Sequence, residues 1–175
     1  MNNLIRMACT SIVISLLMTS FTYAQSSADV YKTLKKLEAR IQIGINHNDY
    51  VAALGDAQYK MNMFVETQES KKKPKLVESL NKTIAHYIYA KNLFDDWVGG
   101  TKCLQAKLSG NEIEVLKEYS KEMVNKANII IKDYPEASKA ISNGNCSDGY
   151  MDIKKVMDIV WRKASDELKK TSKMI

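Results

Sequence analysis

Apolar residues recur at spacings of three and four along the chain after position 25, which is the period of an α-helix with one buried face. The recurring pattern extends over about residues 28–46, 50–69, 74–98, 111–133 and 150–171. Helices that each carry one apolar stripe bury these stripes against one another. The pattern therefore predicts an all-α fold, a single-domain bundle of four to five helices.

Turn-forming residues mark the ends of the predicted helices. Residues 46–49, with the sequence Asn-His-Asn-Asp, predict a tight turn, so the first two helices form an antiparallel hairpin. Pro74 suits the first turn of the third helix, and Gly99 suits the position just past its end. The third helix has the widest apolar face, and we expect it to lie at the centre of the bundle.

The first 24 residues have the layout of a secretory signal peptide. Arg6 supplies a positive charge, Met7 to Phe21 is mostly apolar, and Thr22 and Ala24 are small residues before a cleavage site. The alternative is a membrane anchor, but the apolar run is shorter than the ~18–20 residues that cross a bilayer. We predict cleavage after Ala24, leaving residues 25–175 as one helical domain. The junction resembles Gram-negative bacterial signals, which favours the periplasm or secretion.

Two cysteines remain after removal of this leader, Cys103 and Cys146. Turn-forming residues surround both of them, and an even pair in an oxidising compartment indicates a disulfide between connecting loops. The alternative is a redox or metal-binding pair, but the chain has no Cys-x-x-Cys and no histidine close to either cysteine. If the last three helices simply ran up, down and up, the two cysteines would lie near opposite ends of the bundle. The pairing therefore predicts a long crossover over residues 134–146.

No pattern in the chain predicts a metal, a cofactor or a catalytic group. His47 and His86 have no partners at metal-ligand spacing, and covalent haem would need a Cys-x-x-Cys-His sequence. A non-covalent haem at His86 is conceivable in a bundle, but core packing is the simpler reading. Residues 143–149 superficially resemble a calcium loop, yet Lys154 stands where the bidentate glutamate should be. We therefore expect no cofactor and no enzymatic activity.

A few exposed charges and one aromatic residue are candidates for contact with a partner. Asp95 and Asp96 occupy the last turn of a predicted helix, where acids oppose the helix dipole unless lysines such as Lys91 or Lys102 compensate them. Tyr89 lies beside the main apolar stripe. The basic run at residues 71–75 is either solvated or attracts an acidic partner. The candidate contacts are Lys71, Lys72, Lys73, Lys75, Tyr89, Asp95 and Asp96.

Three hypotheses for function follow. The leading one is an exported, non-catalytic bundle that binds another protein or an envelope component, as an inhibitor or immunity protein, a chaperone-like protein or an assembly accessory. The second is a carrier of a small ligand or cofactor with a cavity between helices. The third is an enzyme that uses carboxylates such as Asp95 and Asp96. The net charge is +6, with acids interleaved among the lysines, so we expect no nucleic-acid partner and only weak attraction to a membrane surface.

Overall fold

The computed structural model describes residues 25–106, 114–141, 146–147 and 149–175, and for residues 114–120 it describes the backbone alone. The predicted signal peptide and most of the calcium-like loop lie outside these residues. Within the described part of the chain, no helix is long and apolar enough to span a bilayer.

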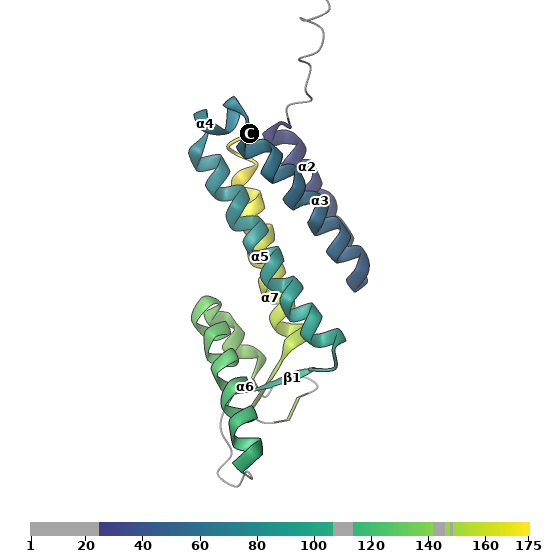
Figure 1. The fold of residues 1–175 in the computed structure, drawn as a ribbon, viewed down its shortest axis with the longest axis vertical. Helices are drawn as coiled ribbons and strands as arrows, with labels where there is room; N and C mark the ends of the chain where they lie inside the picture. Colours follow the sequence, from purple (N-terminus) through teal and green to yellow (C-terminus); the bar gives the residue numbers. More distant parts are fainter. Residues whose placement is uncertain (1–24, 107–113, 142–145, 148) are drawn as a thin grey trace, which may run out of the picture.

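The predicted all-α class is confirmed, and α5 and α7 form the centre of the fold. These two helices lie side by side, the hairpin of α2 and α3 packs against one end of the pair, and α6 and η1 lie at the other end (Figure 1). The helices are α2 (Ser27–Gln42), α3 (His47–Val65), α4 (Gln68–Lys72), α5 (Pro74–Val98), α6 (Glu114–Asp133), the 3-10 helix η1 (Pro135–Ala140) and α7 (Ile153–Thr171).

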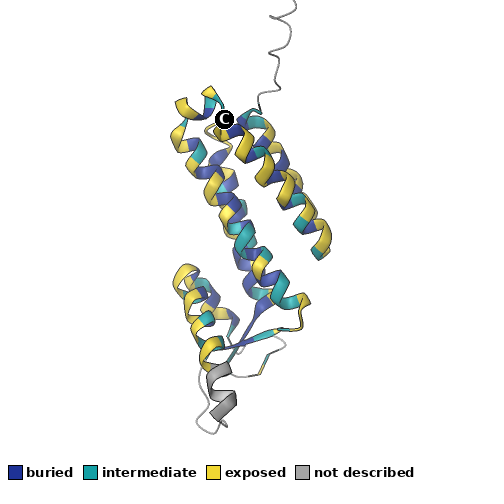
Figure 2. Ribbon diagram, viewed as in Figure 1, coloured by how far each residue is buried: buried dark blue, intermediate teal, exposed yellow. Residues whose placement is uncertain are grey.

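Buried positions follow the contact between α5 and α7, whereas the outer faces of α2, α3 and α6 are exposed (Figure 2). Tyr87 of α5 and Val160 of α7 are almost wholly buried in this contact region. Phe64 of α3 and Leu34 of α2 bring the hairpin into the same core. The apolar stripes that the sequence pattern identified are therefore the surfaces that hold the helices together.

Polar side chains fix where the first helices begin. Ser26 and Asp29 form a capping box at the start of α2, and the Asn46 side chain accepts a hydrogen bond from the backbone N–H of Asp49 in α3. The predicted second helix, residues 50–69, is instead divided. Thr67 ends α3 and caps α4, because its hydroxyl donates to the Phe64 carbonyl while accepting from the backbone N–H of Ser70.

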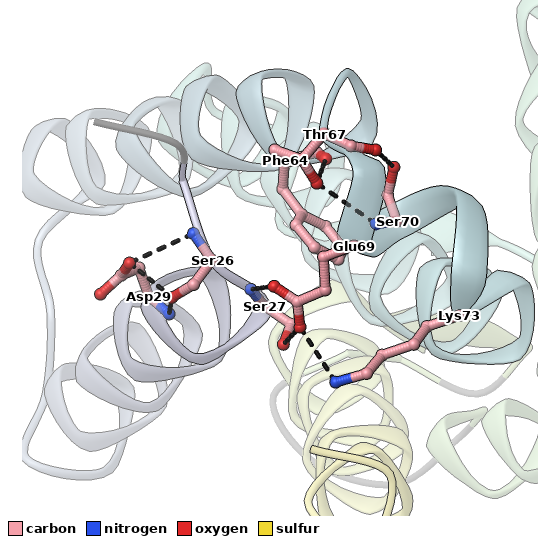
Figure 3. Close-up of polar contacts among 8 residues, drawn as sticks. All are labelled: Ser26, Ser27, Asp29, Phe64, Thr67, Glu69, Ser70 and Lys73. Carbon is pink, nitrogen blue, oxygen red and sulfur yellow. Dashed lines mark hydrogen bonds and ion pairs between the residues drawn. The ribbon is translucent and has the colours of Figure 1, made fainter. Parts of the chain in front are cut away.

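The short helix α4 joins the start of α2 through one carboxylate (Figure 3). Glu69 Oε1 accepts from the Ser27 hydroxyl at 2.6 Å, and Glu69 Oε2 accepts from the Ser27 backbone N–H at 3.4 Å. Lys73 Nζ lies 3.0 Å from Glu69 Oε1. Because Ser27 is the first residue of α2, this carboxylate satisfies an N–H group that has no partner within the helix.

A small antiparallel sheet replaces the predicted first turn of the last helix. Strand β1 (Cys103–Gln105) pairs with β2 (Tyr150–Asp152), with Cys103 opposite Asp152. The prediction that a helix begins at Tyr150 was therefore wrong, and α7 begins at Ile153. The Asp152 carboxylate accepts from the backbone N–H groups of Lys154 and Lys155, so the last residue of β2 is also the N-cap of α7.

The predicted disulfide is confirmed, since Cys103 and Cys146 are bonded with Cα atoms 5.9 Å apart. Cys103 lies in β1 rather than in a loop. The chain that follows α6 returns through η1, which packs on α7, and Ile141 forms an isolated bridge to Met151. This return covers the first part of the crossover predicted for residues 134–146, and residues 142–145 lie outside the described part of the chain.

Candidate functional site

A groove of about 620 Å³ opens between the C-terminal half of α2, the middle of α7 and the end of η1. Its volume lies in the range of small-molecule binding sites in proteins. The apolar part of its surface comes from four elements and consists of Ile41, Tyr87, Ala140, Ile159 and Trp161. The groove exists because the α2–α3 hairpin and the α6–η1 segment cover opposite ends of the α5–α7 pair (Figure 1).

The indole of Trp161 is held in place from behind the groove. Its Nε1–H donates to the Tyr50 hydroxyl at 3.2 Å, and the Tyr50 hydroxyl donates to the Tyr87 carbonyl at 2.8 Å. The Trp161 and Tyr50 rings pack with their centroids 5.9 Å apart. Because Tyr50 and the Tyr87 backbone that holds it both belong to the core, this wall of the groove is preorganised for a ligand.

The hydroxyl of Tyr87 is the most unusual group at the groove. The side chain is 1% exposed, yet its hydroxyl makes no hydrogen bond to any described residue. Burial raises the pKa of this hydroxyl far above its ordinary value of 10, so it retains its proton. A buried donor without an acceptor costs free energy and is uncommon in native proteins.

Carboxylates in the groove differ in how well they are compensated. Glu38 is buried, with one oxygen accepting from the Ser165 hydroxyl and the other from the Lys35 ammonium. Asp158 is exposed at the rim, where partial desolvation nevertheless raises its pKa, while Lys154 and Arg162 oppose that rise. The Glu38 charge is therefore matched within the protein, and the Asp158 charge is left mainly to solvent.

Two cations at the rim have no such partner in the described part of the chain. Among the described residues, neither Lys139 of η1 nor Arg162 of α7 lies within ion-pair distance of a carboxylate. Both also line an adjoining hollow of about 380 Å³ between η1 and α7. There Glu136 pairs with Lys163 at 2.5 Å, and this lysine holds the Glu136 pKa below its ordinary value. The second Glu136 oxygen, Oε2, is buried without a hydrogen bond to any described residue.

The acidic pair singled out in the sequence lies at a different place, the C-terminal end of α5. Asp95 Oδ1 is 2.6 Å from His47 Nε2, and Asp95 Oδ2 is 2.6 Å from Lys91 Nζ. Asp96 instead pairs with Lys126 of α6 at 2.5 Å. The two carboxylates therefore bind different cations and do not converge on one site, which leaves no paired-acid arrangement for proton transfer.

The other predicted contacts are spread over the surface. Lys71, Lys72 and Lys75 are exposed near α4, while Lys73 pairs with Glu69. Tyr89 is half-buried against Tyr134 with ring centroids 4.9 Å apart, and burial raises its pKa to about 12. None of these residues lines the groove.

The two histidines also lie apart. The Nδ1 atom of His86 is 2.8 Å from the Tyr134 hydroxyl, and burial lowers the pKa of His86. His47 packs edge-on against Phe94. In the part of the chain that the structure describes, no three His, Cys, Asp or Glu side chains could hold a metal ion together.

The pattern of the sequence did not reveal the groove. Tyr87 and Trp161 continue the apolar stripes of their helices, which is also the pattern of core positions. The one local signal is Glu38, an acid directly beside Leu37 on the buried face of α2. Comparison with protein-family models, curated proteins and solved structures gives no match to this chain.

Proposed function

We propose that this chain is an exported, non-catalytic binding protein that takes up a small ligand or envelope component in the groove between α2, α7 and η1. The observation that carries the proposal is an apolar groove whose Trp161 wall is fixed by hydrogen bonds and whose rim carries Lys139 and Arg162. Binding sites combine an apolar lining with a few fixed polar groups in this way. A ligand with an apolar body would cover the part of Trp161 that lines the groove.

Export is part of the same proposal. The layout of residues 1–24 supports it, and the disulfide between Cys103 and Cys146 suits an oxidising compartment such as the periplasm. N-terminal sequencing of the protein from a host that expresses the full chain should give Gln25 as the first residue. A mature protein that retains Met1 would contradict export.

Native mass spectrometry of the protein recovered from that host tests ligand binding. The protein should carry an additional non-covalent mass. The substitution Ile41→Trp, which places a large ring at the edge of the groove, should abolish that mass. Ile43→Trp is the matched control, because Ile43 is 86% exposed and lies outside the groove. Equal ligand retention by the two variants would contradict the assignment of the groove.

A second candidate function is binding of a partner protein through α3. Tyr59 is 63% exposed and Met63 is 39% exposed, and their spacing of four residues places both on one side of the helix. Exposed aromatic and methionine side chains are enriched at protein interfaces. A stoichiometric partner that copurifies with the native protein but not with the double substitution Tyr59→Ser and Met63→Ser would favour this function.

A further inference from the structure

The polar groups at the groove that have unused hydrogen-bonding capacity are mainly donors. Among the described residues, the Lys139 and Arg162 side chains have no carboxylate within ion-pair distance. Lysine and arginine are hydrogen-bond donors only. A ligand complementary to these two groups must offer acceptors and a negative charge.

The acceptors at the groove support the same conclusion. Both oxygens of Glu38 are occupied, by Ser165 and by Lys35. Asp158 is exposed to water at the rim and has no need of a donor from a ligand. The groove wall therefore has little to offer a cationic ligand, whereas Arg162 presents a planar guanidinium that can bind a carboxylate through two hydrogen bonds.

Nearby acids limit the charge of the ligand. The positive charge of Arg162 limits the rise of the Asp158 pKa and helps to lower the Glu136 pKa, so it acts on both of these carboxylates. A dianion would be repelled by them more strongly than a monoanion. One negative charge, together with the apolar surface of Ile159 and Trp161, describes an amphiphile with a single carboxylate.

The geometry points to a monoanionic amphiphile as the ligand, with its apolar body over Trp161 and Ile159 and its carboxylate between Arg162 and Lys139. This inference rests on the proposed function, because it names the class of molecule that the groove takes. It assigns Arg162 and Lys139 to selection of the headgroup and the apolar wall to binding of the chain.

Calorimetric titration with three ligands of equal chain length tests the inference. The probes are decanoate, 1-decanol and decylammonium, each below the concentration at which it aggregates. Decanoate should bind about tenfold more tightly than decanol, which is the range expected for hydrogen bonds to a charged group. Decylammonium should bind more weakly than either. Decanol binding as tightly as decanoate would overturn the headgroup assignment.

Replacing basic and acidic residues at the groove one at a time provides a second test, because the two kinds of substitution should change decanoate affinity in opposite directions. Arg162→Gln and Lys139→Gln should each weaken decanoate binding about tenfold and leave decanol binding unchanged. Asp158→Asn removes a like charge at the rim and should strengthen decanoate binding about threefold. Lys169→Gln is the matched control, since Lys169 is an exposed lysine of α7 outside the groove.

The outcomes distinguish failure of the proposed function from failure of the assigned ligand class. If none of the three amphiphiles binds, both the proposed function and the ligand class are wrong. If all three bind with equal affinity and Ile41→Trp abolishes binding, the groove is a binding site but selection of a carboxylate is wrong. Decanoate binding that responds to Lys169→Gln as strongly as to Arg162→Gln would show general attraction to a basic surface and overturn the assignment.

Discussion

His47 Nε2 lies 2.6 Å from Asp95 Oδ1, so the first residue of α3 is bound to the last turn of α5. The same carboxylate accepts from Lys91, one helical turn earlier in α5. An acid at the C-terminal end of a helix opposes the helix dipole. Here two donors offset that cost, and one of them joins the hairpin to the central pair of helices.

We expect Asp95→Asn to destabilise the protein in a pH-dependent way. Hydrogen bonds from Lys91 and His47 hold the Asp95 pKa below its ordinary value of 3.8. The folded state therefore binds fewer protons at Asp95 than the unfolded state does. The stability contributed is present above pH 3.8 and is lost as the pH falls through the lowered pKa.

The Asp95 side chain is 41% exposed, so the expected loss at pH 7 is only about 0.5–1 kcal/mol. Urea unfolding at pH 7 and pH 2.5 measures it, and the difference between variant and parent should shrink at the lower pH. Asp166→Asn, which removes an exposed ion pair within α7, is the control. A loss at pH 2.5 equal to that at pH 7 would contradict the role given to the Asp95 charge.

Removing the hydroxyl of Tyr87 and that of Tyr50 should change the free energy of unfolding in opposite directions. Tyr87→Phe removes a buried hydroxyl that has no described partner, so the free energy of unfolding should rise, by about 1 kcal/mol. Tyr50→Phe leaves the Tyr87 carbonyl and the Trp161 indole N–H without their partner, so it should lower that energy by about 1–3 kcal/mol. Chemical denaturation of both variants without added ligand measures the difference. Destabilisation of equal size in both would show that the Tyr87 hydroxyl is bonded in the native protein.

The helices and their caps were predictable because their causes are local. The stripe of α2 and the capping box at Ser26 lie within a few residues of each other, and Pro74 fixes the start of α5 through its own geometry. The disulfide was predictable from the number of cysteines. Each of these inferences needs only neighbouring residues or a count.

The strand β2 was missed because its cause is distant in the sequence. Residues 150–152 continue the apolar period of α7, so the local pattern favours helix. Pairing with β1 and the bond from Cys103 to Cys146 favour an extended chain. Gly149, with φ of 84°, and the Asp152 cap mark the true boundary, but both signals are common in loops.

The groove was missed for a related reason. Periodicity shows that Trp161 belongs to the inward face of α7, but not whether another helix covers that face. Coverage depends on where α2 ends and where η1 packs, which are properties of the tertiary arrangement. An apolar wall of a binding groove and an apolar core position have the same sequence signature.

Removal of the disulfide should weaken one end of the molecule. The bond closes a segment of 43 residues, and the chain-entropy model gives about 4 kcal/mol for a loop of that size. Replacing Cys103 and Cys146 by serine should lower the free energy of unfolding by about this amount. Hydrogen exchange should show the loss of protection in β1, β2 and η1, with α2 and α3 much less affected. Uniform loss across all helices would contradict a local role.

Glu69 gives the corresponding test at the opposite end of the molecule (Figure 3). Hydrogen bonds from Ser27, followed by that from Lys73, hold the Glu69 pKa below its ordinary value of 4.5. Glu69→Gln keeps the shape of the side chain but removes its charge, and should cost about 1 kcal/mol at pH 7, as loss of a helix cap does. The cost should shrink as the pH falls through the lowered pKa of Glu69, because the parent carboxyl then also becomes protonated.

The matched control for Glu69 is Glu66→Gln, because Glu66 is an exposed residue at the end of α3 without the bonds to Ser27. Hydrogen exchange of the two variants at pH 7 should separate them. Faster exchange confined to the first turn of α2 is expected for Glu69→Gln, since the Ser27 N–H would lose its charged acceptor. The same change in Glu66→Gln would mean that the start of α2 depends on the total charge near α4 rather than on this one carboxylate.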